Sequence, residues 1–151
     1  RSAHKAEVSV ERVVSPQDIE SISAAIRNVP ISDSVMRYAL RLVRTTRIGE
    51  DEGGETPRVV RDYVSWGAGP RASEYLILGA KARALFAGQT HATPEHIREV
   101  ALPVLRHRVL LNFNAEADQV TTEDVVQGLL EGVPVEESPA AVRAQMDDVY
   151  G

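Results

Sequence analysis

The stretch from Trp66 to Phe86, WGAGPRASEYLILGAKARALF, constrains the fold of this chain more than any other stretch. Two glycines and a proline open it, a combination that supplies a tight turn and favours the first position of a helix. Good helix formers follow, interrupted only by Gly79. Most of the positions are apolar, so the pattern predicts a central, deeply buried helix. One helical face carries Tyr75, Leu78, Ala82, Leu85 and Phe86, and much of the remainder is apolar too, so few positions are expected to meet water.

Arg71 lies in the first turn of this predicted helix. A cation there faces the positive end of the helix dipole and four unpaired backbone N–H groups, which is an environment suited to an anion. A bound phosphate would explain the arginine, because helix starts attract phosphate oxygens and a guanidinium can hold two of them. The alternative is a solvated arginine without a partner, and the residues alone leave both interpretations open.

The composition bounds the class of protein. A chain of 151 residues with 43% hydrophobic and 26% charged residues is typical of one soluble, mostly helical domain. The net charge of −5 argues against a general nucleic-acid binder, which needs a basic surplus on one face. No apolar run approaches 18 residues and no hydrophobic signal core is present, so we expect no membrane insertion and a cytoplasmic location.

Several kinds of chemistry lack support in the sequence. There is no cysteine for a disulfide or a thiolate nucleophile, and the four histidines lack metal-ligand spacing, so no metal site is predicted. The P-loop pattern is absent, and no serine has the context of a hydrolase triad. We therefore find no self-sufficient active site. Because the chain begins with Arg1 and not Met, we expect it to be part of a longer protein.

Capping signals place the predicted helices along the chain. Ser15-Pro16 begins a helix over 16–29, and Ser32-Asp33 begins one over 33–47. A short helix is expected from Arg58 to Ser65, after a loop at 48–57 whose glycines and acids predict mobility. Thr93-Pro94-Glu95 starts a helix that Pro103 should break or kink near Leu102.

The C-terminal part is read in the same way. Residues 109–113 are too short a run to assign, whereas Thr121 to Asp124 caps a clear helix that ends at Gly132. Gly88 is expected to end the central helix. Ser138-Pro139 could begin one more helix through Met146.

Two basic clusters have two interpretations each. Arg37, Arg41 and Arg44 form a ridge on the second predicted helix, which is either a solvated face or a contact with an acidic neighbour or a phosphate. The Arg106-His107-Arg108 cluster either lies at the C-terminal end of a helix, where the helix dipole favours cations, or makes subunit or domain contacts.

The segment Gly67-Ala68-Gly69-Pro70-Arg71-Ala72, followed by Leu76 and Ala80–Leu85, resembles the sensor-2 segment of MoxR-type AAA+ ATPases. Other pieces agree in order and resemble the lid domain that follows the ATPase core of this family. They are Ser15-Pro16, Tyr38 with Leu42-Val43 and Thr46-Arg47, Thr93-Pro94-Glu95, and Val104-Leu105-Arg106-His107-Arg108. The resemblance covers about Val14 to Pro134. The lid of magnesium-chelatase AAA+ subunits is related and is a second candidate.

The resemblance implies an all-α fold, a small bundle of about five to six helices with an extended N-terminal segment. Residues 1–14 would then be a linker from a missing ATPase core, 15–134 the lid domain and 135–151 a C-terminal extension. Arg71 would be the sensor-2 arginine that reaches the γ-phosphate of ATP, with Pro70 and Gly69 beside the nucleotide. Gly69 stands where members of the family commonly have serine.

The resemblance also implies partners. In the full-length protein, ATP with Mg²⁺ would be bound mainly by the AAA+ core of the same polypeptide, so this chain alone should not turn over ATP. Such ATPases are chaperone-like, form homo-oligomeric rings, often hexamers, and act with von Willebrand factor A-domain proteins. A different class remains open, namely a free-standing helical adaptor whose basic ridge binds an acidic partner.

Overall fold

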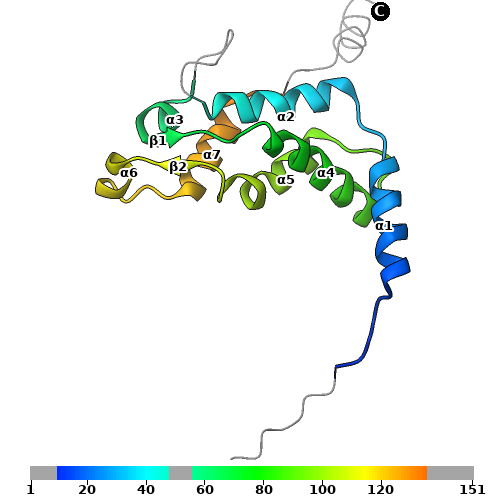
Figure 1. Cartoon of the computed structure of the whole chain (residues 1–151). Helices are drawn as coiled ribbons and strands as arrows, with labels where there is room; N and C mark the ends of the chain where they lie inside the picture. The colour runs from blue at the N-terminus through cyan, green and yellow to red at the C-terminus, as the bar shows by residue number, and fades with distance from the viewer. Residues whose placement is uncertain (1–9, 48–55, 136–151) are drawn as a thin grey trace, which may run out of the picture.

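The structure, a computed structural model, describes residues 10–47 and 56–135, which fold into seven helices and one two-stranded sheet (Figure 1). The all-α class is confirmed, and residues 10–14 lead into the bundle without regular secondary structure. The predicted loop at 48–57 and the predicted helix at 138–146 lie largely or wholly outside the described residues. In chain order the elements are α1 (Pro16–Asn28), α2 (Asp33–Thr45), α3 (Arg58–Tyr63), β1 (Val64–Trp66), α4 (Arg71–Phe86), α5 (Pro94–Leu105), β2 (Leu110–Leu111), α6 (Phe113–Ala117) and α7 (Thr122–Gly132).

Local capping explains where the helices begin. The backbone N–H of Ser15 donates to Asp18 and the N–H of Asp18 donates back to Ser15, and Thr121 and Asp124 repeat this reciprocal pair at the start of α7. At the end of α4, Gly88 adopts a φ of 68°, the left-handed conformation that glycine tolerates. These predicted boundaries are confirmed.

The central position predicted for α4 is also confirmed. This helix packs against α5, α2 and α1, and Figure 1 shows it below α2 with α1 beside its C-terminal end. Its buried stripe consists of small residues and one leucine at helical spacing. They are Ala72, Leu76, Ala80 and Ala84, each 0% exposed.

The expectation that few positions of α4 meet water is wrong. Tyr75, Leu78 and Phe86 are 48%, 43% and 72% exposed, so these three large side chains lie on the outer side of the helix. Alanine lets neighbouring helix backbones approach closely, and the neighbours of α4 therefore pack on its alanine stripe. Hydrophobicity alone did not distinguish the two faces, since both are apolar.

Of the two outcomes expected at Pro103, a break or a kink, the break is wrong as well. Helix α5 continues to Leu105, and Pro103 lies within its last turn on the exposed side. Proline there removes one backbone hydrogen bond but leaves the packing intact. Ile97, Ala101 and Leu105 are each fully buried on one face of α5, and their burial holds the last turn in the helix.

A small sheet replaces the end of the short helix predicted to reach Ser65. Helix α3 ends at Tyr63, and β1 pairs antiparallel with β2, so that Trp66 lies opposite Leu110. The side chain of Asn112 adds a connection between the segment after β2 and α3 by donating to the carbonyl of Asp62 at 2.8 Å. Asn112 also caps α6, a five-residue helix that the sequence did not predict.

Candidate functional site

The turn that precedes α4 is held by the C-terminal end of α2. The hydroxyl of Thr46 accepts a hydrogen bond from the backbone N–H of Ala68 at 2.8 Å and donates to the carbonyl of Val43 at 2.6 Å. The adjacent Arg47 donates from Nε to the carbonyl of Ala68 at 2.8 Å. Thr46 is 1% and Ala68 0% exposed, so these hydrogen bonds satisfy backbone groups that water cannot reach.

The two glycines of the turn have different roles. Neither has a positive φ, so the turn does not use the left-handed conformation that glycine tolerates. A Cβ atom at Gly67 would lie 2.6 Å from the carbonyl carbon of Thr46 and closer still to its oxygen. Glycine is therefore needed at this position for space. A Cβ at Gly69 would meet nothing within 4 Å, so a serine would fit there.

Arg71 is the first residue of α4 and its side chain is exposed. It makes no hydrogen bond or ion pair with any other residue in the part of the chain that the structure describes. The guanidinium is consequently available to a ligand. Pro70 and Gly69, which precede it, are exposed too.

The backbone at this helix start differs from the sequence-based expectation of four unpaired N–H groups. The N–H of Ala72 donates to the carbonyl of Gly69 at 2.9 Å, and that of Ser73 donates to the carbonyl of Pro70 at 3.1 Å. The Ser73 hydroxyl also donates to the Pro70 carbonyl, at 2.6 Å. An anion at this end of α4 would therefore interact mainly with the guanidinium of Arg71.

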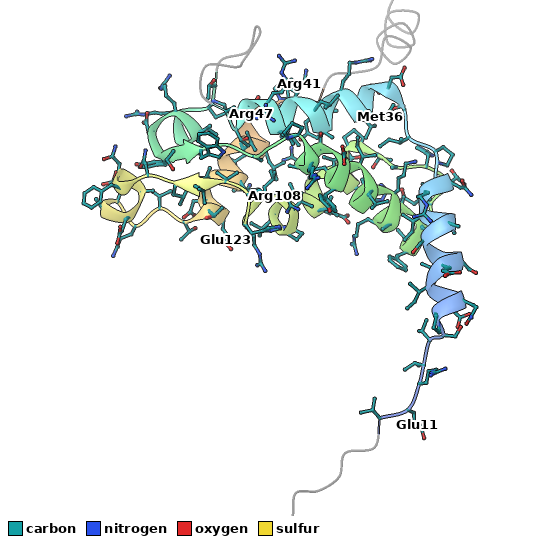
Figure 2. All side chains as sticks on the ribbon, in the orientation of Figure 1. Glu11, Met36, Arg41, Arg47, Arg108 and Glu123 are labelled. Carbon is teal, nitrogen blue, oxygen red and sulfur yellow. The ribbon has the colours of Figure 1, made fainter. Side chains whose placement is uncertain are left out.

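The basic ridge of α2 is partly engaged in holding the bundle together. Nη2 of Arg41 donates to the carbonyl of Pro134 at 2.6 Å, which joins α2 to the segment after α7 (Figure 2). Arg37 and Arg44 are exposed on the same helix. Within the described residues, no hydrogen bond or ion pair joins this ridge to Arg71.

The Arg106-His107-Arg108 cluster lies just after α5. Arg106 and His107 are exposed, whereas Arg108 is half-buried and donates from Nη1 to the carbonyl of Val104 at 2.8 Å. The same nitrogen contacts Nε2 of His107. The guanidinium carbon of Arg108 lies 4.8 Å from the centre of the Tyr75 ring, a cation–π arrangement.

His107 and Arg108 border a groove of about 470 Å³ between α1, α4 and the end of α5, whose other walls include Ile26, Tyr75 and Leu78. Figure 2 labels Arg108 in the region of α4 and α5, below α2 in this view. Tyr75 is one helical turn beyond Arg71 on α4, so the groove begins close to the candidate arginine.

Two polar residues, Arg98 and His96, have structural roles that the sequence did not predict. Arg98 donates from Nη1 to the Tyr38 hydroxyl at 3.0 Å and to the carbonyl of Leu130 at 2.8 Å, which ties α5 to α2 and α7. The ring of His96 accepts from the N–H of Thr93 at 3.1 Å and thereby caps α5. No cluster of potential metal ligands occurs among the residues that the structure describes.

Comparison with known proteins identifies the class of domain. The family model of the AAA lid domain matches residues 57–129. Chaperone MoxR1 of Mycobacterium tuberculosis (strain ATCC 25618 / H37Rv) is 32% identical over 123 residues, which is 82% of this chain and 32% of that protein. The uncharacterized protein YeaC of Bacillus subtilis (strain 168) is 27% identical over 135 residues, 89% of this chain and 38% of that protein.

The fold has a counterpart of known structure. A crystal structure at 2.00 Å resolution of a protein from Cytophaga hutchinsonii ATCC 33406, described as an ATPase, matches with a TM-score of 0.75 and 34% identity. The match covers 84% of this chain and 38% of that one. This chain thus spans roughly a third of the length of its curated relatives, at 32% and 38%.

The helical fold, the turn before α4 and these matches define an AAA lid domain. More particularly, the chain is a lid domain of the MoxR type of AAA+ ATPases.

Within the described ranges, none of the helices has the length and apolar character that crossing a membrane requires.

Proposed function

We propose that this domain is the lid of a chaperone-like, ring-forming AAA+ ATPase and that Arg71 is its sensor-2 arginine. In this proposal the guanidinium contacts the γ-phosphate of ATP held by the ATPase core of the same polypeptide. The observation that carries the proposal is the exposure of the Arg71 side chain and its lack of a partner in the described part of the chain. Its guanidinium is exposed and has no partner among the described residues, although the turn that presents it is fixed by buried hydrogen bonds.

The residues present fit a triphosphate. A guanidinium offers a planar fork of N–H donors that can hold two phosphate oxygens, and Arg71 has all of its donors available. The pairing of the Ala72 and Ser73 N–H groups means that the side chain, and not the backbone, would supply the contact. Gly69 and Pro70 would line the approach, since both are exposed and Gly69 has open space where a side chain would be.

The mechanism assigned to this domain is electrostatic. Mg²⁺, when bound with ATP in the core, neutralises charge on the phosphates. Arg71 would add a fixed positive charge at the oxygens on which negative charge grows as the γ-phosphate is transferred. Such a contact lowers the barrier only to the extent that it is stronger in the transition state than in the bound substrate. The P-loop lysine and the metal-binding acid would come from the core, so the isolated chain is expected to show no ATP turnover.

The wider setting belongs to the same proposal. We place the parent protein in the cytoplasm as a homo-oligomeric ring, a hexamer, that acts with a von Willebrand factor A-domain protein. MoxR1, with 32% identity to this chain, is described as a chaperone, which supports the chaperone-like role. Arg37, Arg106 and His107 are exposed basic residues that would make contacts within such an assembly.

The test uses the assembled full-length parent. Steady-state ATP hydrolysis and nucleotide affinity are measured for Arg71→Ala and Arg71→Lys. Loss of a charge-assisted hydrogen bond, about 1.5–3 kcal/mol, predicts a fall in kcat of roughly 10- to 100-fold with a smaller change in affinity. Lysine should rescue poorly because it keeps the charge and loses the planar fork.

Arg83→Ala is the matched control for this experiment. Arg83 lies on the same helix and forms an exposed ion pair with Glu99 at 2.7 Å, so its loss should leave turnover near wild type. Wild-type turnover in both Arg71 variants would exclude Arg71 from the nucleotide site. The alternative would then be an adaptor whose basic ridge on α2 binds an acidic partner.

A further inference from the structure

Two residues at the end of α2 hold the backbone on both sides of the Ala68 Cα atom. The N–H of Ala68, in the peptide group it shares with Gly67, donates to Thr46 Oγ1. The carbonyl of Ala68, in the peptide group it shares with Gly69, accepts from Arg47 Nε. Both distances are 2.8 Å. Two successive peptide groups are thereby fixed against α2, which limits rotation of the turn as well as its displacement.

The contact between the turn and α2 is close. Gly67 approaches the carbonyl group of Thr46 so nearly that a methyl group could not be inserted. The Thr46 hydroxyl is itself oriented, because it donates to the carbonyl of Val43 at 2.6 Å and so presents a lone pair to Ala68. The acceptor that holds the turn is therefore part of the terminal turn of α2.

The turn before α4 also fixes the start of that helix. Ala72 and Ser73 bond to the carbonyls of Gly69 and Pro70, so the first turn of the helix is continuous with the segment that Thr46 and Arg47 hold. Arg71 itself has no contact that would fix its guanidinium. The two hydrogen bonds at Ala68, together with the packing of α4 on α2, therefore set the position of the Arg71 Cα atom relative to α2. A misplacement of about 1 Å in a catalytic group can reduce a rate roughly 100-fold.

We propose that Thr46 and Arg47 are positioning residues for Arg71, through the hydrogen bonds that they make to Ala68. This inference rests on the proposed function, because it assigns to both residues the task of placing the sensor-2 guanidinium at the γ-phosphate. It adds a role for the end of α2 in the catalytic step, although neither Thr46 nor Arg47 touches the nucleotide. Their loss should affect turnover more than nucleotide affinity.

The test is a double-mutant cycle in the assembled full-length parent. Thr46→Val keeps the shape of the side chain and removes the acceptor, while Thr46→Ser keeps the hydroxyl. We expect Thr46→Val to lower kcat about tenfold or more with less than about a threefold change in ATP affinity, and Thr46→Ser to stay near wild type. In an Arg71→Ala background, Thr46→Val should have no further effect on kcat, because the group that it positions is gone.

Tyr38→Phe is the control for a general loss of stability. It also removes a buried hydroxyl hydrogen bond, the one with Arg98, and that hydroxyl makes no hydrogen bond to the turn. In the ¹⁵N-labelled 151-residue chain, Thr46→Val should abolish hydrogen-exchange protection of the Ala68 amide, and Tyr38→Phe should preserve it. Arg47→Met is the second variant should Thr46→Val not fold, since Arg47 is half-buried and methionine retains its aliphatic stem.

The outcomes separate the two proposals. Wild-type kcat in Arg71→Ala would remove the proposed function, and the positioning role with it. A second outcome would overturn the positioning role alone. In that outcome Arg71→Ala lowers kcat strongly, but Thr46→Val and Arg47→Met turn over ATP as fast as Tyr38→Phe. The positioning role would also be overturned if Thr46→Val lowered kcat by the same factor in the wild-type and Arg71→Ala backgrounds. The loss would then be independent of the arginine.

Discussion

Replacing Gly67 by alanine should destabilise this domain, because the turn before α4 rests directly on the end of α2. The new Cβ would lie 2.6 Å from the carbonyl carbon of Thr46 and 2.8 Å from Cγ of Arg47. Carbon atoms that are not bonded to each other reach their optimal contact at about 3.5–4.0 Å, so the overlap is close to 1 Å. The Thr46 atoms are backbone and cannot rotate away as a side chain could.

The magnitude follows from the two ways of relieving this overlap. If the turn stays in place, the strain is that of overpacking, about 1–3 kcal/mol. If the turn moves away from α2, the two hydrogen bonds at Ala68 are lost, at about 0.5–1.5 kcal/mol each. Both routes give about 1–3 kcal/mol. The reduced backbone freedom of the unfolded alanine variant offsets at most about 1 kcal/mol of this.

The assay is urea unfolding followed by far-UV circular dichroism, with Gly69→Ala as the matched control. Gly69 lies two residues away in the same turn, and nothing is within 4 Å of its added Cβ. We expect Gly67→Ala to lower the free energy of unfolding with an unchanged denaturant slope, and Gly69→Ala to remain within about 0.5 kcal/mol of wild type. Equal stability of the two variants would refute the argument that Gly67 is required for space.

Two further predictions concern stability. The pKa of Asp124 is lowered from its ordinary value of 3.8, mainly by a hydrogen bond from the side chain of Thr121. The ionised carboxylate therefore stabilises the fold at pH values above the ordinary pKa. This contribution is lost as the pH falls through the lowered pKa of the folded state. The melting temperature should accordingly drop below about pH 4, and the drop should be smaller in Asp124→Asn, measured by thermal melts from pH 2 to 7. Arg98→Leu should cost about 1–3 kcal/mol, because it leaves the carbonyl of Leu130 without its donor. Arg83→Leu should cost less than about 1 kcal/mol, since it loses only a surface ion pair, and equal denaturation midpoints for these two variants would contradict this reasoning.

The sequence by itself determined the features that depend on neighbours three or four residues away. Ser15 with Asp18 and Thr121 with Asp124 are capping pairs, and each began a helix at the expected residue. Gly88 ended α4 for an equally local reason, its left-handed backbone. The placement of Arg71 in the first turn of a helix came from the same kind of signal. These interactions form within one turn of the chain, so no knowledge of the rest of the fold was needed.

The tertiary structure decided whatever depends on which elements meet. Both faces of α4 are apolar, and only its packing against α5, α2 and α1 selected the alanine stripe and left Tyr75 half-exposed. The partner of Trp66 in the sheet is Leu110, more than forty residues along the chain. Thr46 and Ala68 are likewise distant in sequence, so the hydrogen bond that holds the turn before Arg71 could not be read from local spacing. Contacts of this kind form only when the chain has closed large loops, and the energy that favours one such pairing over another comes from burial summed over the whole core.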